Sequence, residues 1–232
     1  MTKKIFAKNS SWTFEKNVPK KFSHHIKQSV PYYEEGHQII SSVSDFFLKK
    51  NSCVYDIGSS TGTLLNKIKN RHDNKKINFY GIETVKKMID QAKLENKNNR
   101  VKYINKNIMK TALKKSDLIT SYYTIQFIDP KNRQQVIDKI YKSLNWGGAF
   151  IMFEKTRASD ARFQDIYTQT YNDFKLNQGF TEKEIINKSR SLKGILEPFS
   201  DFGNLGLLKR SGFKDTIPIF QWFCFKGYLS IK

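Results

Sequence analysis

Cysteine is scarce in this sequence, and its scarcity limits the chemistry that the chain can support. The 232 residues include only Cys53 and Cys224, too few for a disulfide framework or for a cluster of thiolate metal ligands. The four histidines show no regular spacing to cysteine or to acidic residues, so no metal site is expected. Isolated free cysteines are typical of a reducing cytoplasm, which is the location that we expect.

Long apolar runs are also absent. No window comes near the ~18 consecutive apolar residues of a membrane-spanning helix, and the lysine-containing start of the chain lacks the apolar core of a secretory leader. The sequence has only five prolines and no linker rich in glycine and serine, while 38% of its residues are hydrophobic. These features predict a polar arm over residues 1–20 and one globular domain over residues 21–232.

Acidic residues are outnumbered, since 21 Asp and Glu stand against 41 Lys and Arg and give a formal net charge of +20. Over residues 49–115, 17 basic against 5 acidic residues leave an excess of 12. Nucleic-acid binding is one interpretation. However, 34 of the 41 basic residues are lysine, whereas arginine is the residue that binds phosphates in bidentate fashion. We therefore favour a solvated basic surface that attracts small anions, and direct nucleic-acid binding is not expected.

What the sequence does contain is a regular alternation of strand and helix patterns. Short apolar runs predict strands, and apolar residues at helical spacing predict helices between them. The predicted strands cover residues 52–58, 77–83, 101–107, the first half of 117–128 and 147–155, and the predicted helices cover 36–50, 61–72, 85–96, 133–145 and 201–211. This alternation indicates an α/β fold in which a parallel sheet is covered by helices on both faces.

The last third of the chain departs from this alternation. Residues 158–195 contain two predicted helices, 160–177 and 181–192, which form a helical insert. The aromatic-rich segments 213–223 and 224–231 follow one another too closely for a crossover connection, so they predict an antiparallel pair at the sheet edge. The expected sheet is therefore seven-stranded and mostly parallel, with a C-terminal antiparallel pair.

The turn after the first predicted strand, within VYDIGSSTG (54–62), has the composition of a ligand-binding turn. Gly58 permits a sharp bend and a close approach of the backbone to a ligand. Ser59 and Ser60 are small enough to keep the floor of the site open, and Gly62 allows the next helix to begin close to the strand. A ligand is expected beyond the carboxyl end of this strand.

Two acidic residues flank that turn and indicate the kind of ligand. Asp56 lies just before the first glycine, and Glu83 ends the second strand, where a carboxylate can accept hydrogen bonds from both hydroxyls of a ribose. The pattern D-x-G-x-x-x-G is not the G-x-G-x-x-G fingerprint that seats a pyrophosphate, and an acid at this place disfavours phosphate. It suits a ligand with an ammonium, a sulfonium and a ribose. We therefore expect S-adenosyl-L-methionine rather than NAD or ATP.

The ends of the third and fourth strands supply further candidates. Asn107 is placed to accept a hydrogen bond from the adenine amino group, and Ile108 to present its amide to a ring nitrogen. The alternative for Asn107 is that it caps its own turn. Tyr122 and Tyr123 either line the pocket or belong to the core, and the sequence leaves both possibilities open.

Several longer segments resemble one known family. They are WTFEKNV (12–18), IKQSVPYY (26–33), TIQFIDPKNRQQVIDKIYKSLNWGG (124–148), EK (154–155) and NDFKLNQGFTEKEIINKSRSL (172–192). On these segments the chain resembles the carboxy-S-adenosyl-L-methionine synthase family, which has the Rossmann-like fold of class I adenosylmethionine-dependent methyltransferases. The resemblance covers approximately residues 12–230.

The resemblance implies a transferase with an unusual reaction. In this family prephenate supplies carbon dioxide and leaves phenylpyruvate, while the methyl group of adenosylmethionine loses a proton and is carboxylated. A partner enzyme then transfers the carboxymethyl group of the product to the wobble uridine of tRNA. The resemblance also implies a homodimer that binds adenosylmethionine, its carboxylated form or S-adenosylhomocysteine.

The family's cofactor contacts carry over residue by residue onto Tyr33, Gly58, Ser59, Ser60, Glu83, Thr84, Asn107, Ile108 and Tyr122. The arginine that pairs with the added carboxylate matches Arg190, which is the expected catalytic residue, because a guanidinium fork suits a carboxylate. The alternative is an exposed helical arginine. The chain departs from the family's usual residues in four places: Glu83-Thr84 replaces Asp-Asn, Asn107 replaces Asp, Tyr122 replaces Asn and Ser59 replaces a frequent Cys.

Two other functions remain open. The changed pocket residues favour an ordinary adenosylmethionine-dependent methyltransferase that acts on a small molecule or RNA, whereas the insert with Arg190 disfavours it. A catalytically silent RNA-binding module is supported only by the basic segment 49–115. The aromatic residues Trp12 and Phe14 and the run FQWFCF (220–225) are expected in the core or in a subunit interface.

Overall fold

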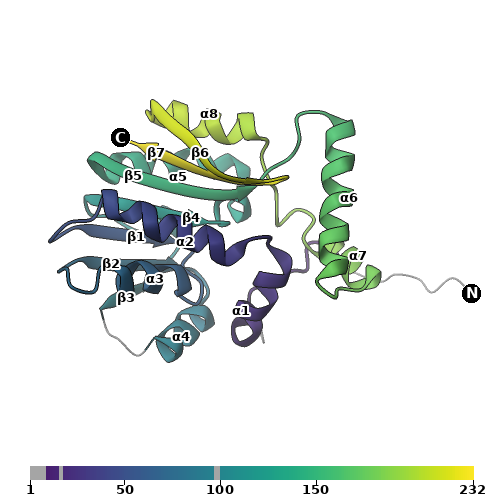
Figure 1. Cartoon of the computed structure of the whole chain (residues 1–232), viewed down its shortest axis with the longest axis horizontal. Coiled ribbons are helices and arrows are strands. Elements are labelled where there is room, and N and C mark those ends of the chain that lie inside the picture. The colour runs from purple at the N-terminus through teal and green to yellow at the C-terminus, as the bar shows by residue number, and fades with distance from the viewer. Residues whose placement is uncertain (1–8, 16–17, 97–99) are drawn as a thin grey trace, which may run out of the picture.

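Residues 9–15, 18–96 and 100–232 are described by the computed structural model, whose centre is a seven-stranded sheet in the order β3-β2-β1-β4-β5-β7-β6 (Figure 1). The strands are β1 (Cys53–Ile57), β2 (Asn78–Glu83), β3 (Val101–Asn105), β4 (Ser116–Tyr122), β5 (Leu144–Lys155), β6 (Asp215–Trp222) and β7 (Phe225–Ile231). The first five strands are parallel, and β7 runs antiparallel to both β5 and β6. The predicted mostly parallel sheet with a C-terminal antiparallel pair is confirmed.

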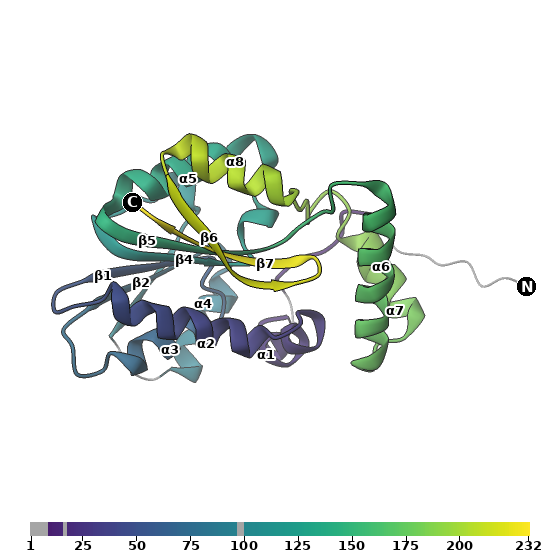
Figure 2. The ribbon, with the colours of Figure 1, turned by 45° about the horizontal axis from the view of Figure 1, so that its top comes forward.

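Helices cover both faces of this sheet, as a parallel sheet requires. Figure 2 shows α5 (Pro130–Ser143) and α8 (Asp201–Ser211) on one face, and α2 (Tyr33–Val43) and α3 (Thr63–Arg71) on the other. The helix α4 (Lys86–Glu95) contacts β2 and β3 near the sheet edge. The expected three-layer arrangement is therefore present.

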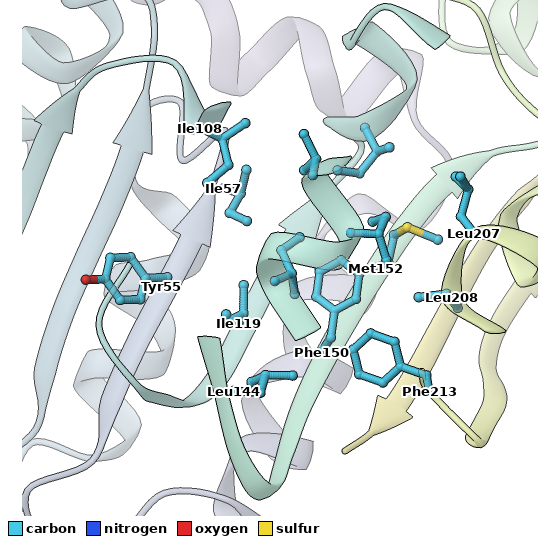
Figure 3. Packing of buried hydrophobic residues seen from close by; sticks show 14 of the residues in the cluster. Tyr55, Ile57, Ile108, Ile119, Leu144, Phe150, Met152, Leu207, Leu208 and Phe213 are labelled. Atoms are coloured by element: carbon cyan, nitrogen blue, oxygen red, sulfur yellow. The ribbon is translucent and has the colours of Figure 1, made fainter. Parts of the chain in front are cut away.

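Two apolar cores lie on the two faces, which explains why the parallel strands read as continuous apolar runs. On one face Ile119 and Met152 of the sheet pack in the same cluster as Leu207 of α8 (Figure 3). On the other face Ile151 packs in the same cluster as Leu65 of α3. All five of these side chains are almost completely buried, and burial of each contributes roughly 1.5–3 kcal/mol.

The predicted helical insert forms two helices that stand beside the body of the molecule at one end of the sheet (Figures 1 and 2). These are α6 (Ala161–Asn177) and α7 (Glu182–Ser191). Gly179, with a φ of +87°, separates them, and the side chains of Thr181 and Glu184 form a capping box at the start of α7. No residue of α6 is fully buried, so this helix lies largely on the surface.

The helix α1 (Val18–Ser29) was not expected from the sequence. It crosses the predicted boundary between the arm (1–20) and the domain (21–232), and that division of the chain stays a prediction. Residues 1–8 and 16–17 of the arm lie outside the described residues. Three short 3₁₀ helices complete the described chain, η1 (Ser44–Phe46), η2 (Ile108–Lys110) and η3 (Ile125–Phe127). No described helix is long and apolar enough to cross a membrane.

Candidate functional site

A cavity of about 560 Å³ lies at the carboxyl ends of the parallel strands. Its wall includes Ile57 at the end of β1, Glu83 at the end of β2 and Tyr122 at the end of β4. Because β1 has β2 on one side and β4 on the other, the strand order reverses beside it. Ligands of open α/β sheets bind at such a switch point, and the volume is typical of a pocket for a small molecule.

The glycine turn after β1 forms one wall of the cavity. The N–H groups of Gly58 and Ser59 both donate to the carbonyl oxygen of Ile82, at 2.8 and 3.1 Å. Gly58 has a φ of +73°, and a Cβ atom added there would clash with the side chain of Thr124. The left-handed backbone and the crowding both require glycine at this position. Gly62 also has a positive φ and lies directly before α3.

Asp56 is buried near the end of β1, and its Oδ1 accepts a hydrogen bond of 2.7 Å from Thr120 Oγ1. The pKa of this carboxyl is raised to about 7, mainly by burial and also by the charge of Glu83, with the hydrogen bond from Thr120 acting in the opposite direction. A cation brought next to Asp56 would favour its ionised form and lower this pKa. The site therefore suits a ligand with an ammonium or sulfonium group better than a phosphate.

Glu83 lies at the tip of the neighbouring strand and is also mostly buried. Its Oε2 accepts a hydrogen bond from the N–H of Ser60 at 2.9 Å, and its Oε1 accepts one from the N–H of Val85 at 2.9 Å. The hydroxyl of Thr84 also donates to Oε1, at 3.3 Å. An ionised carboxylate offers about four acceptor positions, so a ribose hydroxyl can use the remaining position or replace the long hydrogen bond from Thr84. Thr84, its expected partner, also lines the cavity.

Asn107 and Ile108 line the cavity on the side of β3. The Oδ1 of Asn107 accepts a hydrogen bond of 2.9 Å from the N–H of Met109, so Asn107 caps its own turn at the start of η2. This is the alternative that the sequence left open, and it uses one of the two acceptor positions of the oxygen that was expected to accept from adenine. The contact of these two residues with adenine stays a prediction.

The tyrosines at the end of β4 belong both to the cavity and to the core. Tyr122 and Tyr123 line the cavity and pack within or against the buried cluster on the face of α2 and α3. The hydroxyl of Tyr122 donates to the carbonyl oxygen of Tyr33 at 2.8 Å, and the two rings lie 5.1 Å apart. Tyr33 thus reaches the cavity from the start of α2, and its contact with the cofactor stays a prediction.

The polar groups of the cavity fit adenosylmethionine. The hydroxyl of Ser59 is buried, lines the cavity and has no hydrogen-bond partner among the described residues. It lies in the turn between Asp56 and Glu83, so a ligand that lies on this turn would supply its missing partner. Among the described residues no group of three or more His, Cys, Asp or Glu side chains is placed to hold a metal ion.

Some cavity residues were not recognised from the sequence. Trp12 and Phe14, expected in the core or in an interface, line the cavity, as do Lys155 at the end of β5 and Lys188 of α7. The EK pair at 154–155 carried the family resemblance without an assigned role, and that was the only signal for Lys155.

Arg190 is exposed on α7 and is not among the residues that line the cavity. Its expected pairing with a carboxylate stays a prediction.

Known proteins similar to this chain include two bacterial enzymes of the same name. The chain is 36% identical over 222 residues to the carboxy-S-adenosyl-L-methionine synthase of Staphylococcus epidermidis, with 95% of this chain and 97% of the relative covered. It is 33% identical over 238 residues to the carboxy-S-adenosyl-L-methionine synthase of Campylobacter lari, with both chains covered completely. A family model described as a methyltransferase domain matches residues 54–148, which include the glycine turn and both acids.

Solved structures with a similar fold include methyltransferases of low sequence identity. A putative O-methyltransferase from Nostoc punctiforme has a TM-score of 0.66 at 16% identity, with 94% of this chain and 61% of that chain covered. Human N-acetylserotonin methyltransferase, in a complex with adenosylmethionine, has a TM-score of 0.57 at 13% identity, with 95% and 60% covered. These likenesses confirm the predicted Rossmann-like fold. The near-complete alignments above 30% identity show that the chain belongs to the carboxy-S-adenosyl-L-methionine synthase family.

Proposed function

We propose that this protein carboxylates S-adenosyl-L-methionine, with prephenate as the carboxyl donor, and so produces carboxy-S-adenosyl-L-methionine. The observation that carries the proposal is the pair of buried acids, Asp56 and Glu83, on the two sides of a glycine turn in a chain of this family. The activity named for the two relatives supports the product. The family resemblance supports prephenate as the donor.

The atoms of this reaction balance without a further reagent. Loss of carbon dioxide and hydroxide from prephenate leaves phenylpyruvate, because the ring becomes aromatic. The hydroxide takes up the proton that the methyl group of adenosylmethionine loses and becomes water. A carbon–carbon bond then joins that methyl carbon to carbon dioxide, and the product carries one new carboxylate.

The residues of the chain bind and orient the two substrates. Asp56 pairs with the cationic methionine part of the nucleoside, and Glu83 accepts hydrogen bonds from the ribose hydroxyls. The aromatic side chains of Phe14, Phe127 and Tyr122 line the same cavity. They exclude water from the reacting carbon, so carbon dioxide meets the methyl carbon before it escapes or is hydrated. Arg190 is proposed, from the resemblance, to pair with the new carboxylate.

Plain methyl transfer is the second candidate, and two features of the pocket favour it. Tyr122 stands where the family usually has Asn, and its hydroxyl is bonded to the backbone of Tyr33. Asn107 stands where the family usually has Asp and caps its own turn. A pocket changed at these positions is compatible with a diverged acceptor, since one fold hosts many acceptors.

The wider setting of the reaction rests on the resemblance alone. It implies a cytoplasmic homodimer whose product is used by a second enzyme to modify the wobble uridine of tRNA. Phe163 and Ile166 are exposed apolar residues on α6 and are compatible with a subunit contact there. Direct nucleic-acid binding is not part of the proposal.

A product assay tests the proposal. Purified protein is incubated with adenosylmethionine and prephenate, and the nucleoside products are identified by mass spectrometry. Carboxy-S-adenosyl-L-methionine and equimolar phenylpyruvate are expected. If adenosylmethionine binds but no carboxylated product forms at high enzyme concentration, the proposal is wrong. Release of S-adenosylhomocysteine in the presence of an acceptor would instead support plain methyl transfer.

A further inference from the structure

Three lysine side chains converge at the part of the cavity region that is built by β5, α6 and α7. They are Lys155 at the end of β5, Lys175 on α6 and Lys188 on α7, and each is partly buried. Lys155 and Lys188 line the cavity itself. The ring of Tyr171 is contacted by two of them, since its centroid lies 4.1 Å from Lys155 Nζ and 4.3 Å from Lys175 Nζ. The side chains therefore form one cationic cluster.

Neutral groups, rather than acids, surround these ammonium groups. Lys188 Nζ lies 5.1 Å from the ring centroid of Trp12, donates to Ser29 Oγ at 3.0 Å and contacts His25 Nε2. Among the residues that the structure describes, no carboxylate forms an ion pair with any of the three lysines. The indole N–H of Trp12 is also buried without an acceptor in the described part of the chain.

Such an arrangement is unfavourable in the absence of an anion. Burial, together with the charges of neighbouring lysines, lowers the pKa of Lys175 to about 8 and that of Lys188 to about 8. Burial also lowers the pKa of Lys155. Cations that are partly desolvated and close to one another need a negative partner to remain charged at low cost. An anionic ligand in the cavity would supply that partner.

We propose that Lys155 and Lys188, with Lys175 behind them, form the subsite that binds the carboxylate groups of the carboxyl donor. This inference rests on the proposed function: the donor binds beside the lysines, and the nucleoside binds beside Asp56 and Glu83 in the same cavity. Aromatic residues lie between and around these lysines, including Trp12, Tyr171 and Phe225. They match a donor with a compact ring and attached carboxylates better than a fully hydrated phosphate.

The test uses Lys155→Met and Lys188→Met, which remove the charge and keep the length of the side chain. Lys183→Met is the matched control, because Lys183 is exposed on the same helix as Lys188 and does not line the cavity. Prephenate binding to the protein saturated with adenosylmethionine is measured by calorimetry, and KM and kcat are measured separately. The two cavity variants should weaken prephenate binding at least tenfold and raise its KM, with adenosylmethionine affinity within twofold of wild type. The control should change neither.

Two further measurements separate binding from a structural role. Lys155→Arg and Lys188→Arg should restore part of the prephenate affinity, because they restore the charge. The Met variants should unfold at the same or a higher temperature than wild type without ligand, since they remove cations that lack an acidic partner. Prephenate binding equal to wild type in both Met variants would overturn the inference. So would weakened binding of carboxy-S-adenosyl-L-methionine with unchanged binding of prephenate.

Failure of the proposed function remains distinguishable from failure of the subsite. If wild type makes no carboxylated product, malonate is titrated into the protein saturated with adenosylmethionine. Malonate binding by wild type and Lys183→Met, and its loss in Lys155→Met and Lys188→Met, would support a carboxylate subsite without the proposed reaction. Malonate binding that the cavity variants leave unchanged, or no malonate binding to any of these proteins, would overturn the subsite.

Discussion

Glu83 Oε2 accepts a hydrogen bond of 2.9 Å from the backbone N–H of Ser60, so the tip of β2 holds the glycine turn that follows β1. The carboxylate expected to bind ribose thus also orders the turn beneath the nucleoside. The side chain of Glu83 therefore serves both the binding site and the local fold. Removal of its charge should weaken ligand binding more than it destabilises the turn, because backbone hydrogen bonds also hold the turn.

Glu83→Gln should weaken adenosylmethionine binding by about 10- to 100-fold, because hydrogen bonds to a charged acceptor contribute ~1.5–3 kcal/mol. Calorimetric titration measures the affinity. The control is Glu182→Gln, which changes an exposed acid on α7 and should bind as wild type does. An affinity that Glu83→Gln leaves unchanged would contradict the ribose assignment.

Adenosylmethionine binding should depend on pH through Asp56. The pKa of Asp56 is raised to about 7 by burial, so the acid is neutral at lower pH and cannot pair with the ligand's cation. Between pH 5.5 and pH 7 the ligand's amino group stays protonated, and affinity should rise by about tenfold as Asp56 ionises. Asp56→Asn should bind weakly with little pH dependence over this interval. A wild-type slope that persists in Asp56→Asn would assign the titration to another group.

Gly58→Ala should destabilise the turn and abolish tight adenosylmethionine binding. The residue has a φ of +73°, and the new Cβ would clash with Thr124. The left-handed backbone costs about 1–2 kcal/mol and overpacking typically adds 1–3 kcal/mol. Gly147→Ala is the matched control, because Gly147 has a φ of +75° but no atom within 4 Å of the added Cβ. Thermal melting and ligand titration of both variants separate crowding from backbone strain, and equal effects would rule out crowding at Gly58.

Arg190→Ala should weaken the binding of carboxy-S-adenosyl-L-methionine by about 10- to 100-fold relative to the binding of adenosylmethionine. The reason is that a hydrogen bond to a charged group contributes ~1.5–3 kcal/mol. Competition binding with the two nucleosides measures this ratio. Arg162→Ala, at an exposed arginine of α6, serves as the control. If Arg190→Ala leaves the ratio unchanged, the proposed pairing of Arg190 with the added carboxylate is wrong. The lysine subsite would then be the remaining candidate for binding that carboxylate.

Most of the sheet was predictable because burial of parallel strands leaves a direct pattern in the sequence. β1 is buried at all five positions and is a continuous apolar run except for Asp56. That exception was itself informative, since a buried acid before a glycine turn indicates a cationic ligand. The helix α1 was not predicted because its sequence, VPKKFSHHIKQS, is mostly polar and does not lie between two predicted strands.

The choice between Lys188 and Arg190 shows what sequence comparison leaves undecided. Both lie on α7 two positions apart, which corresponds to about 200° around a helix. The two side chains therefore leave the helix on different sides: Lys188 lines the cavity, whereas Arg190 is exposed and is not among the lining residues. Which side of a half-exposed helix faces the cavity depends on the elements against which the helix packs, and those elements are distant in sequence.

By itself, the sequence determined the order of strands and helices, the glycine turn and the two acids, because each depends on residues close together along the chain or on the common edge of parallel strands. Only the tertiary structure decided that Trp12, Lys155 and Lys188 line the same cavity. Contacts between an arm, a strand end and an inserted helix follow from packing between distant segments, and local sequence patterns do not record them.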